Sequence, residues 1–300
     1  MKIKLIGLGK MGMNIAQNML DHELDVTGYA RSQKTRDAAR ALNIPVADSY
    51  GELLKRNDEN YVVWLLVPNN VVDQVLLEIR PLLKKGDIIV DGGNSNFNLS
   101  IMRHATLKDH GLDFIDLGTS GGTHGARNGA CLMAGGEIEV IKKLEPVFLK
   151  IATKDGYAHV GKPGAGHFVK MVHNGIEYGM MQAIGEGFAF LEKSDFELDY
   201  YQIANVWNHG SIIESLLIKN IRDAFSKSPE LSELAGVVDD SGEGMWMIEE
   251  ALSSKVALPV ITAALFARYK SKDETKFGEK VVAAIRNEFG GHKVYKKDEK

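Results

Sequence analysis

A stripe of polar residues on one predicted helix has the side chains needed for acid–base chemistry. The stretch GAGHFVKMVHNGIEY begins at Gly164. At about 100° per residue, four polar side chains fall within an arc of roughly 100°: Lys170, His173, Asn174 and Glu177. A water-exposed polar face with an ordinary core histidine is one interpretation of this pattern. Glycines along the helix favour close packing instead, namely Gly175, Gly179, Gly185 and Gly187. Because burial lowers the pKa of an ammonium group, Lys170 is the candidate base.

A glycine-rich turn near the N-terminus predicts a dinucleotide site. The sequence GLGKMG fits the spacing G-x-G-x-x-G and lies between a predicted strand and a predicted helix. Gly7 permits the tight turn, Gly9 lets a pyrophosphate approach the backbone, and Gly12 lets the helix pack closely on the strand. The helix N-terminus adds N–H groups and a partial positive charge. A merely structural turn is the alternative. The predicted cofactor contacts are Gly7, Leu8, Gly9, Lys10, Met11 and Gly12.

The end of the second predicted strand distinguishes NAD from NADP. An acidic residue there would bond the ribose 2′-hydroxyl of NAD, but this strand ends in Ala30-Arg31-Ser32. Arg31 can pair with a 2′-phosphate, supported by Ser32. We therefore favour NADP, with NAD as the second option, and a solvated loop charge at Arg31 as the alternative interpretation. Further predicted cofactor contacts lie after later strands, at Val67 and Asn94.

The elements that position these residues alternate between strands and helices in the first half of the chain. We expect strands at residues 3–6, 25–29, 61–67 and 87–90, and helices at 11–21, 35–42, 50–56 and 71–83. The continuous apolar run YVVWLLV is typical of a parallel strand buried on both faces. Alternating strands and helices imply right-handed crossovers and a Rossmann-type doubly wound parallel sheet.

The pattern changes at the breaker cluster KPGAG, which starts at Lys162. Beyond it the periodicity is helical, and we expect helices at residues 167–193, 201–221, 245–252, 260–268 and 276–288. The fold class is therefore α/β followed by all-α. We expect a dinucleotide-binding Rossmann-type domain at residues 1–162 and an all-helical substrate and oligomerisation domain at residues 163–300.

Composition excludes several classes of protein. Lys plus Arg is 36 and Asp plus Glu is 40, so the net charge of −4 lacks the basic excess of a nucleic-acid-binding protein. No apolar run approaches the ~18 residues of a membrane span, and the N-terminus does not read as a signal peptide. We therefore expect a cytoplasmic protein. The single cysteine, Cys131, excludes an intrachain disulfide, and we expect it to be buried. No metal-ligand spacing is evident.

Four segments carry a resemblance to a known family. They are GLGKMG (7–12), VDGGNS (90–95), DLGTSGGTHGARNG (116–129) and KPGAGHFVKMVHNGIEYG (162–179). Together they resemble decarboxylating 6-phosphogluconate dehydrogenases of the short type, within the β-hydroxyacid dehydrogenase superfamily. The resemblance implies oxidation and decarboxylation of 6-phospho-D-gluconate to D-ribulose 5-phosphate and CO₂, with reduction of NADP or NAD. It fits both the pentose phosphate pathway and gluconate catabolism.

The resemblance also implies a division of chemical tasks. Lys170 would take the proton from the C3 hydroxyl as hydride leaves. The same lysine, once protonated, would polarise the C3 carbonyl while CO₂ departs. Glu177 would then protonate C1 of the enediol. No metal is required in this scheme, because the lysine is the electrophile.

Substrate contacts follow from the same resemblance. Residues that would hold the carboxylate and hydroxyls are Asn94, Ser120, Gly121, Gly122, His173 and Asn174; Tyr178 and Arg268 would hold the phosphate. Arg286 and His292 resemble a tail segment that reaches a neighbouring subunit's active site, so we expect a homodimer or homotetramer with shared sites. The chain departs from longer members near Ser241, where their phosphate-binding lysine is missing. Either the Ser241 hydroxyl contributes there, or phosphate binding is weaker or arranged differently.

Two alternatives remain open at this point. A 3-hydroxyisobutyrate-type or tartronate semialdehyde-type dehydrogenase would share the turn and the lysine, but would need neither a phosphate clamp nor Glu177 as a proton donor. A catalytically silent NADP-binding regulatory protein would be expected to have lost the lysine–glutamate pair. Lys170 and Glu177 are both present, which favours an enzyme.

Overall fold

The computed structural model describes residues 1–56 and 59–296. The chain forms two compact units, one from Met1 to Asn174 and one from Gly175 onward. The division lies inside a single long helix, α8 (Ala165–Glu192). The sequence instead placed a boundary at Lys162, between a cofactor-binding domain and a substrate-binding helical domain. That functional boundary stays a prediction.

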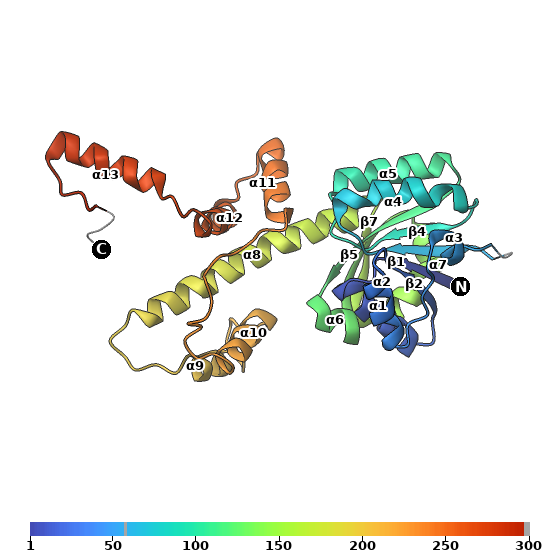
Figure 1. Cartoon of the computed structure of the whole chain (residues 1–300), viewed down its shortest axis with the longest axis horizontal. Coiled ribbons are helices and arrows are strands. Elements are labelled where there is room, and N and C mark those ends of the chain that lie inside the picture. The colour runs from blue at the N-terminus through green and yellow to red at the C-terminus, as the bar shows by residue number, and fades with distance from the viewer. Residues whose placement is uncertain (57–58, 297–300) are drawn as a thin grey trace. The chain divides into compact units, whose positions relative to one another are not determined.

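A mostly parallel sheet forms the centre of the first unit (Figure 1). Its strand order is β2-β1-β3-β4-β5-β6-β7, and only the β5–β6 pairing is antiparallel. The strands are β1 (Lys2–Ile6), β2 (Asp25–Tyr29), β3 (Tyr61–Leu65), β4 (Ile88–Asp91), β5 (Asp113–Ser120), β6 (Ala130–Gly135) and β7 (Ala152–Gly161). The expected Rossmann-type α/β architecture is therefore confirmed, with an antiparallel step that the expectation of a parallel sheet did not include.

Both faces of this sheet are apolar, which explains the continuous apolar run of β3. Val62 and Trp64 belong to one buried cluster, whereas Tyr61 and Val63 belong to another, because successive strand residues point to opposite faces. Helices α1, α6 and α7 supply the first cluster, and α4 and α5 the second. The helices are α1 (Lys10–Asp21), α2 (Gln33–Ala41), α3 (Tyr50–Leu53), α4 (Asn69–Ile79), α5 (Phe97–Asp109), α6 (Gly122–Asn128) and α7 (Ile138–Ile151), with a short 3-10 helix η1 (Arg80–Leu82).

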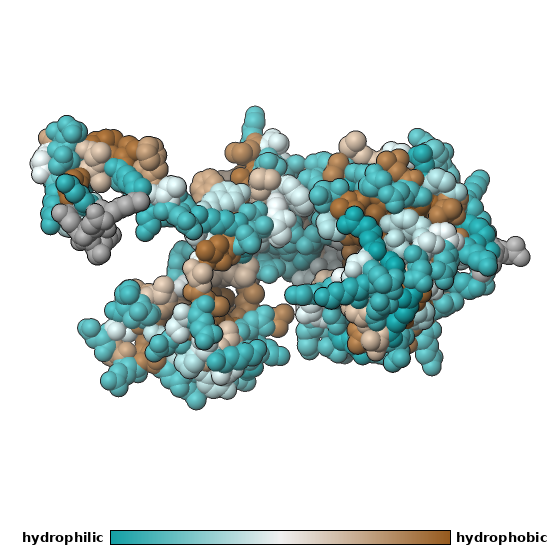
Figure 2. Space-filling view, in the orientation of Figure 1, coloured by the Kyte–Doolittle hydropathy of each residue, from teal (hydrophilic) through white to brown (hydrophobic). Residues whose placement is uncertain are grey.

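The described residues of the second unit form helices joined by loops and no strands, as expected. Its helices after α8 are α9 (Tyr200–Trp207), α10 (Leu216–Phe225), α11 (Glu243–Ser254), α12 (Pro259–Ser271) and α13 (Phe277–Gly290). Several apolar side chains on α13 are exposed: Phe277, Val281, Val282, Ile285 and Phe289. Figure 2 shows brown, hydrophobic surface over this helix.

The expectation of one helix over residues 201–221 was wrong. Gly210 takes a φ of +82°, which ends the helical path after α9. Ser215 then caps a new helix, because its hydroxyl accepts a hydrogen bond from the Ile218 amide at 3.2 Å. Two helices therefore replace the one that periodicity alone indicated.

The expected burial of Cys131 was also wrong, because its side chain is exposed. Its neighbours Ala130 and Leu132 are buried, so strand alternation turns Cys131 outward, and the β6–β7 register shifts between those two neighbours. On α8, Gly175 and Gly179 are buried, but Gly185 and Gly187 are exposed and do not pack closely in this chain. Among the described residues, no helix has the length and apolar character needed to cross a membrane.

Candidate active site

The glycine turn between β1 and α1 has the shape that a dinucleotide requires. Gly7 has a φ of +109°, and a Cβ there would collide with the Leu66 carbonyl. A Cβ on Gly12 would collide with the Gly7 carbonyl oxygen, so the helix starts directly against the turn. Gly9 caps α1, and a Cβ added there would meet nothing within 4 Å. The open approach to Gly9 and the first-turn N–H groups of α1 fit a pyrophosphate.

The loop after β2 presents Arg31 to solvent. Arg31 is exposed, and no ion pair involves it in the part of the chain that the structure describes. Arg36 stabilises this loop by donating hydrogen bonds to the carbonyls of Ala30 at 2.7 Å and Arg31 at 2.9 Å. Ser32 occupies the N-cap position of α2. Sequence analysis missed Arg36, whose supporting role is visible only in its contacts.

Tyr50 is an ionisable residue whose pKa Arg31 influences. Burial first, then Tyr29 and Glu78, together raise the pKa of Tyr50 to about 12, against the opposite effect of Arg31. The Tyr29 and Tyr50 rings lie 4.5 Å apart. Tyr50 therefore stays a neutral hydroxyl near the proposed cofactor arginine.

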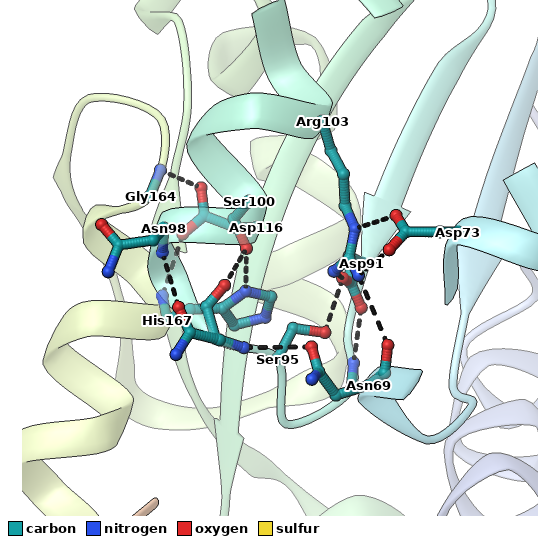
Figure 3. A network of polar contacts seen from close by, with 12 residues as sticks. Asn69, Asp73, Asp91, Ser95, Asn98, Ser100, Arg103, Asp116, Gly164 and His167 are labelled. Atoms are coloured by element: carbon teal, nitrogen blue, oxygen red, sulfur yellow. Dashed lines mark hydrogen bonds and ion pairs between the residues drawn. The ribbon is translucent and has the colours of Figure 1, made fainter. Parts of the chain in front are cut away.

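The loop after β4 carries Asn94 and is held by a buried carboxylate (Figure 3). Asp91 is fully buried and accepts hydrogen bonds from the Ser95 hydroxyl at 2.8 Å and the Gly93 amide at 3.2 Å. Arg103 donates to the same carboxylate at 3.3 Å. Asn94 is left exposed on the fixed loop. The other predicted cofactor residue, Val67, lies beside both glycine turns, since a Cβ on Gly7 or on Gly93 would touch it.

A second carboxylate, Asp73 on α4, links the helix that follows the Val67 loop to α5, the helix that follows the Asn94 loop. Arg103 donates through Nε to Asp73 at 2.7 Å, and this hydrogen bond lowers the pKa of Asp73 below its ordinary value. The Asn69 side chain accepts from the Asn96 amide at 3.2 Å. The loops that carry Val67 and Asn94 are therefore cross-linked through their polar groups.

Lys170, His173, Asn174 and Ser120 form one hydrogen-bonded chain. Lys170 is 7% exposed and donates to Asn174 Oδ1 at 2.7 Å. His173 Nδ1 lies 3.0 Å from the same oxygen, and His173 Nε2 lies 3.0 Å from the Ser120 hydroxyl. A proton on Nδ1 allows the imidazole to donate to Asn174 and to accept from Ser120. Lys170 and His173, two members of the expected polar stripe, therefore lie against β5 at Gly118 and Ser120.

Glycine on β5 makes room for Lys170. A Cβ on Gly118 would lie 2.6 Å from Lys170 Cβ and 2.9 Å from the Gly166 carbonyl oxygen. At the end of β5, Gly121 and Gly122 have φ values of +107° and +61°. A Cβ on Gly122 would meet nothing within 4 Å, so the backbone after Ser120 is open to a ligand. This geometry suits a carboxylate approaching N–H groups.

The predicted phosphate residues meet in the second unit. The Arg268 guanidinium lies 3.5 Å from the centre of the Tyr178 ring and donates to the Asp239 carbonyl at 2.7 Å. The Tyr178 hydroxyl accepts from the Ser241 amide at 3.1 Å, and the Ser241 hydroxyl is 3.4 Å from it. Ser241 therefore places a hydroxyl beside Tyr178 where longer members were expected to have lysine. Glu177 precedes Tyr178 and is half-buried.

Glu243 was missed by sequence analysis. Its side chain is 2% exposed, and within the described residues neither carboxylate oxygen has a hydrogen-bond partner. It lies in the first turn of α11, directly after Ser241 and Gly242. Burial of a carboxylate is not readable from the local pattern SGEGMW.

The tail residues Arg286 and His292 lie close to each other at the end of α13. The His292 amide is 3.4 Å from the Arg286 carbonyl, and the Asn287 side chain donates to the His292 carbonyl at 2.9 Å. Both side chains are exposed. Over the described residues, no group of three or more His, Cys, Asp or Glu side chains is arranged to hold a metal ion.

Comparisons with known proteins agree with these features. The model for the NAD binding domain of 6-phosphogluconate dehydrogenase matches residues 2–161, and that for the family's C-terminal domain matches residues 166–195. "Putative 6-phosphogluconate dehydrogenase YqeC" of Bacillus subtilis (strain 168) is 47% identical, over 99% of this chain and 100% of its own. The NAD(+)-dependent, decarboxylating 6-phosphogluconate dehydrogenase of Haloferax volcanii is 37% identical, over 100% of both chains.

A solved structure shows the same fold over the whole chain. The 6-phosphogluconate dehydrogenase of Plasmodium falciparum has a TM-score of 0.83 and 28% identity, covering 100% of this chain and 67% of that one. That enzyme has been solved with NADP⁺ and with 6-phosphogluconate. The matched segments include the glycine turn and the helix that carries Lys170 and Asn174. The chain therefore belongs to the 6-phosphogluconate dehydrogenase family of nicotinamide-dependent oxidoreductases.

Proposed function

We propose that this protein oxidises and decarboxylates 6-phospho-D-gluconate to D-ribulose 5-phosphate and CO₂. The observation that supports this most is the buried Lys170 amine, held at 2.7 Å by Asn174 Oδ1 beside the His173–Ser120 pair. A buried amine favours the neutral form, because burial penalises the ammonium charge. A neutral amine at this place can accept the proton of a substrate hydroxyl.

Lys170 has two successive tasks in this proposal. It first removes the proton from the C3 hydroxyl, while a bound nicotinamide supplies the acceptor for the C3 hydride. The resulting β-keto acid can lose CO₂, because the C3 carbonyl takes up the electron pair of the breaking bond. The protonated Lys170 then donates a hydrogen bond to that carbonyl oxygen. Asn174 keeps the lysine in place through both steps.

Glu177 is the proposed acid for the last step. Decarboxylation leaves an enediol, and C1 must receive a proton to give ribulose 5-phosphate. Glu177 lies about two helical turns beyond Lys170 on α8, so the acid and the base project from one helix. Separate residues for the two proton transfers allow each pKa to suit its own task.

Substrate positioning is proposed to use two groups of residues. Backbone N–H groups and side chains would hold the carboxylate and hydroxyls, at Asn94, Ser120, Gly121, Gly122, His173 and Asn174. Tyr178, Arg268 and the Ser241 hydroxyl would bind the phosphate. We further propose that Arg286 and His292 complete the site of a second copy, in a homodimer or homotetramer.

NADP is the proposed cofactor, with NAD as the second option. Support comes from Arg31, which is exposed and lies on a loop that Arg36 holds at the Ala30 and Arg31 carbonyls. A guanidinium pairs well with a 2′-phosphate. A relative named as NAD(+)-dependent makes NAD the competing cofactor to test. Because phosphorylated sugar acids and dinucleotides occur inside cells, we propose a cytoplasmic setting, in the pentose phosphate pathway or gluconate catabolism.

One assay tests the proposal directly. The purified chain is mixed with 6-phosphogluconate and either NADP or NAD, while reduced cofactor and CO₂ are followed in parallel. We expect equal amounts of both products and a preference for NADP. Matched reactions contain either 3-hydroxyisobutyrate or D-glycerate in place of 6-phosphogluconate. Oxidation of D-glycerate gives tartronate semialdehyde. Turnover of either of these without turnover of 6-phosphogluconate would overturn the proposal in favour of a non-decarboxylating dehydrogenase.

A further inference from the structure

We infer that Asp116 is a positioning residue that sets the location of Lys170 by capping the N-terminus of α8. The inference rests on the proposed role of Lys170 as the base and assigns the residue that holds that base in place. Asp116 lies on β5 and is fully buried. It is a charged side chain in the core of the first unit for which the proposed reaction has no use.

Both oxygens of Asp116 accept hydrogen bonds from the start of α8 (Figure 3). Oδ1 accepts from the Gly164 amide at 2.7 Å, and Oδ2 accepts from the His167 amide at 2.9 Å. Gly164 directly precedes the helix, and His167 is its third residue. In a capping box, two side chains from the helix itself satisfy these two positions. Here a single carboxylate from a strand satisfies both.

The helix N-terminus also stabilises the charge of Asp116. No basic side chain forms an ion pair with this carboxylate within the described residues. The first N–H groups of a helix carry a partial positive charge, and bonds from an N–H to a carboxylate are stronger than bonds between neutral groups. The buried negative charge and the helix end therefore depend on each other.

Glycines bring the carboxylate and the helix into direct contact. A Cβ on Gly135 would lie 2.7 Å from both carboxylate oxygens of Asp116. A Cβ on Gly166 would collide with the Asp116 carbonyl and lie 2.6 Å from the Met133 carbonyl. No residue other than glycine at either place would allow the present approach of α8 to β5 and β6.

The same strand positions both the helix end and the base. Asp116 and Gly118 are two residues apart on β5, so their positions face the same side of the sheet. Asp116 binds the first turn of α8, and Gly118 contacts Lys170 in the next turn. A shift of the first turn would therefore displace Lys170 from Gly118 and from its place in the Asn174–His173–Ser120 chain.

A neighbouring histidine adds a further contact. His167 Nδ1 lies 2.7 Å from the Ser100 hydroxyl on α5, and the His167 ring is 1% exposed. His167 Nε2 has no hydrogen-bond partner in the described part of the chain. The histidine thus orients the turn through one bond, whereas Asp116 satisfies two backbone donors at once.

The test compares Asp116→Asn with a matched control, Asp87→Asn. The amide keeps one acceptor oxygen, but its NH₂ group faces the second backbone donor. Asp87 is also fully buried and accepts from two backbone amides, Tyr61 at 2.9 Å and Lys84 at 2.9 Å, and unlike Asp116 it also pairs with the Arg56 guanidinium at 2.6 Å. It directly precedes β4, at the opposite end of that strand from Asp91, and within the described residues none of its hydrogen bonds reaches α8. Both variants remove one buried charge.

Two measurements distinguish positioning from general stability. We expect Asp116→Asn to lower kcat about 10- to 100-fold with the Kd for NADP unchanged, because a misplacement of about 1 Å costs that much in rate. Acetylation of Lys170, followed by mass spectrometry, should become several-fold faster, because the amine loses its packed position. Asp87→Asn should lower Tm without either change. If Asp116→Asn is insoluble, Asp116→Ser, which also keeps a single acceptor group, replaces it.

The outcomes separate this inference from the proposed function. Lys170 acetylation needs no substrate, so it reports on positioning even if 6-phosphogluconate is not turned over. A faster acetylation of Lys170 that is seen only in the Asp116 variants supports the inference. Acetylation of Lys170 that is unchanged in Asp116→Asn, or raised equally in Asp87→Asn, overturns it, and so does an unchanged kcat in an active enzyme.

Discussion

Asp91 and Asp116 are register partners on the adjacent parallel strands β4 and β5, and both are fully buried. Asp91, at the carboxyl end of β4, accepts hydrogen bonds from the loop that follows it, whereas Asp116 accepts them from the start of α8, which follows β7. Asp91 holds the loop that carries Asn94, and Asp116 holds the helix that carries Lys170. Ligands of open α/β sheets bind at this edge. These two carboxylates, paired on neighbouring strands, therefore hold in place the two segments that carry Asn94 and Lys170.

Replacement of Lys170 by alanine should abolish NADPH formation and leave NADP binding intact. The variant loses the amine that would accept the C3 proton, and general-base catalysis is worth about 10²–10⁴-fold. Initial rates and fluorescence titration with NADP measure the two effects. Lys154→Ala, an exposed lysine on β7, is the control and should behave as native. Robust turnover in Lys170→Ala would remove the base assignment.

Replacement of Glu177 by alanine should slow the steps after hydride transfer. Stopped-flow absorbance should show a rapid first formation of NADPH followed by slow steady turnover, about 10²-fold or more below native. The reason is that only the C1 proton donor is lost. Glu186→Ala, on the same helix and exposed, should leave both phases unchanged. An unaltered steady rate in Glu177→Ala would count against the acid role.

Replacement of Arg31 by aspartate should turn cofactor preference towards NAD. The binding free energy of NADP should weaken by the equivalent of one charge-assisted hydrogen bond, ~1.5–3 kcal/mol. The ratio of kcat/KM for the two cofactors measures it. Lys142→Asp makes the same charge change on the exposed surface of α7 and should not alter the ratio. A native chain that already prefers NAD would contradict the role given to Arg31.

Alanine at Gly166 should destabilise the protein, whereas alanine at Gly187 should not. The new methyl at Gly166 would collide with the Asp116 carbonyl, and overpacking typically costs about 1–3 kcal/mol. Gly187 lies on the same helix with nothing within 4 Å of an added Cβ, so alanine there should add about 0.5–1 kcal/mol. Urea unfolding gives both free energies. Equal effects at the two sites would show that the α8–β5 contact is not tight.

The ion pair of Arg103 with Asp73 should make a small part of the stability depend on pH. Because Arg103 lowers the folded-state pKa of Asp73, the contribution is present above the unfolded pKa of about 3.9 and is lost as pH falls through the folded value. The Asp73 side chain is 62% exposed, so Asp73→Asn should cost less than about 1 kcal/mol at neutral pH. Urea unfolding at pH 7 and below pH 3 checks this. A difference that persists in acid would contradict the origin proposed.

Sequence patterns predicted most elements of residues 1–91 but none of those of residues 97–161. The apolar runs of β3 and β4 are uninterrupted, and in β1 the apolar residues Ile3, Leu5 and Ile6 are buried around Lys4, so the burial of these strands can be predicted from the sequence. By contrast, β5 reads DFIDLGTS and β6 reads ACLMAG, where polar residues and glycines hide the strand. Those same residues, Asp116, Gly118 and Gly135, are the ones that receive α8. Because the positions that contact α8 are polar or glycine, these strands lack the apolar pattern by which a strand is recognised in a sequence.

Local residue spacing alone was sufficient to predict the glycine turn and the polar stripe of α8. Both depend only on backbone geometry over a few residues, which is the same wherever the segment lies. Spacing could not predict that Asp116 would meet Gly164 and His167, which are 48 and 51 residues away along the chain. Contacts at such separations depend on how closely helix and strand approach. Only the packed glycines of α8, β5 and β6 decide that approach, and with it the burial of Lys170.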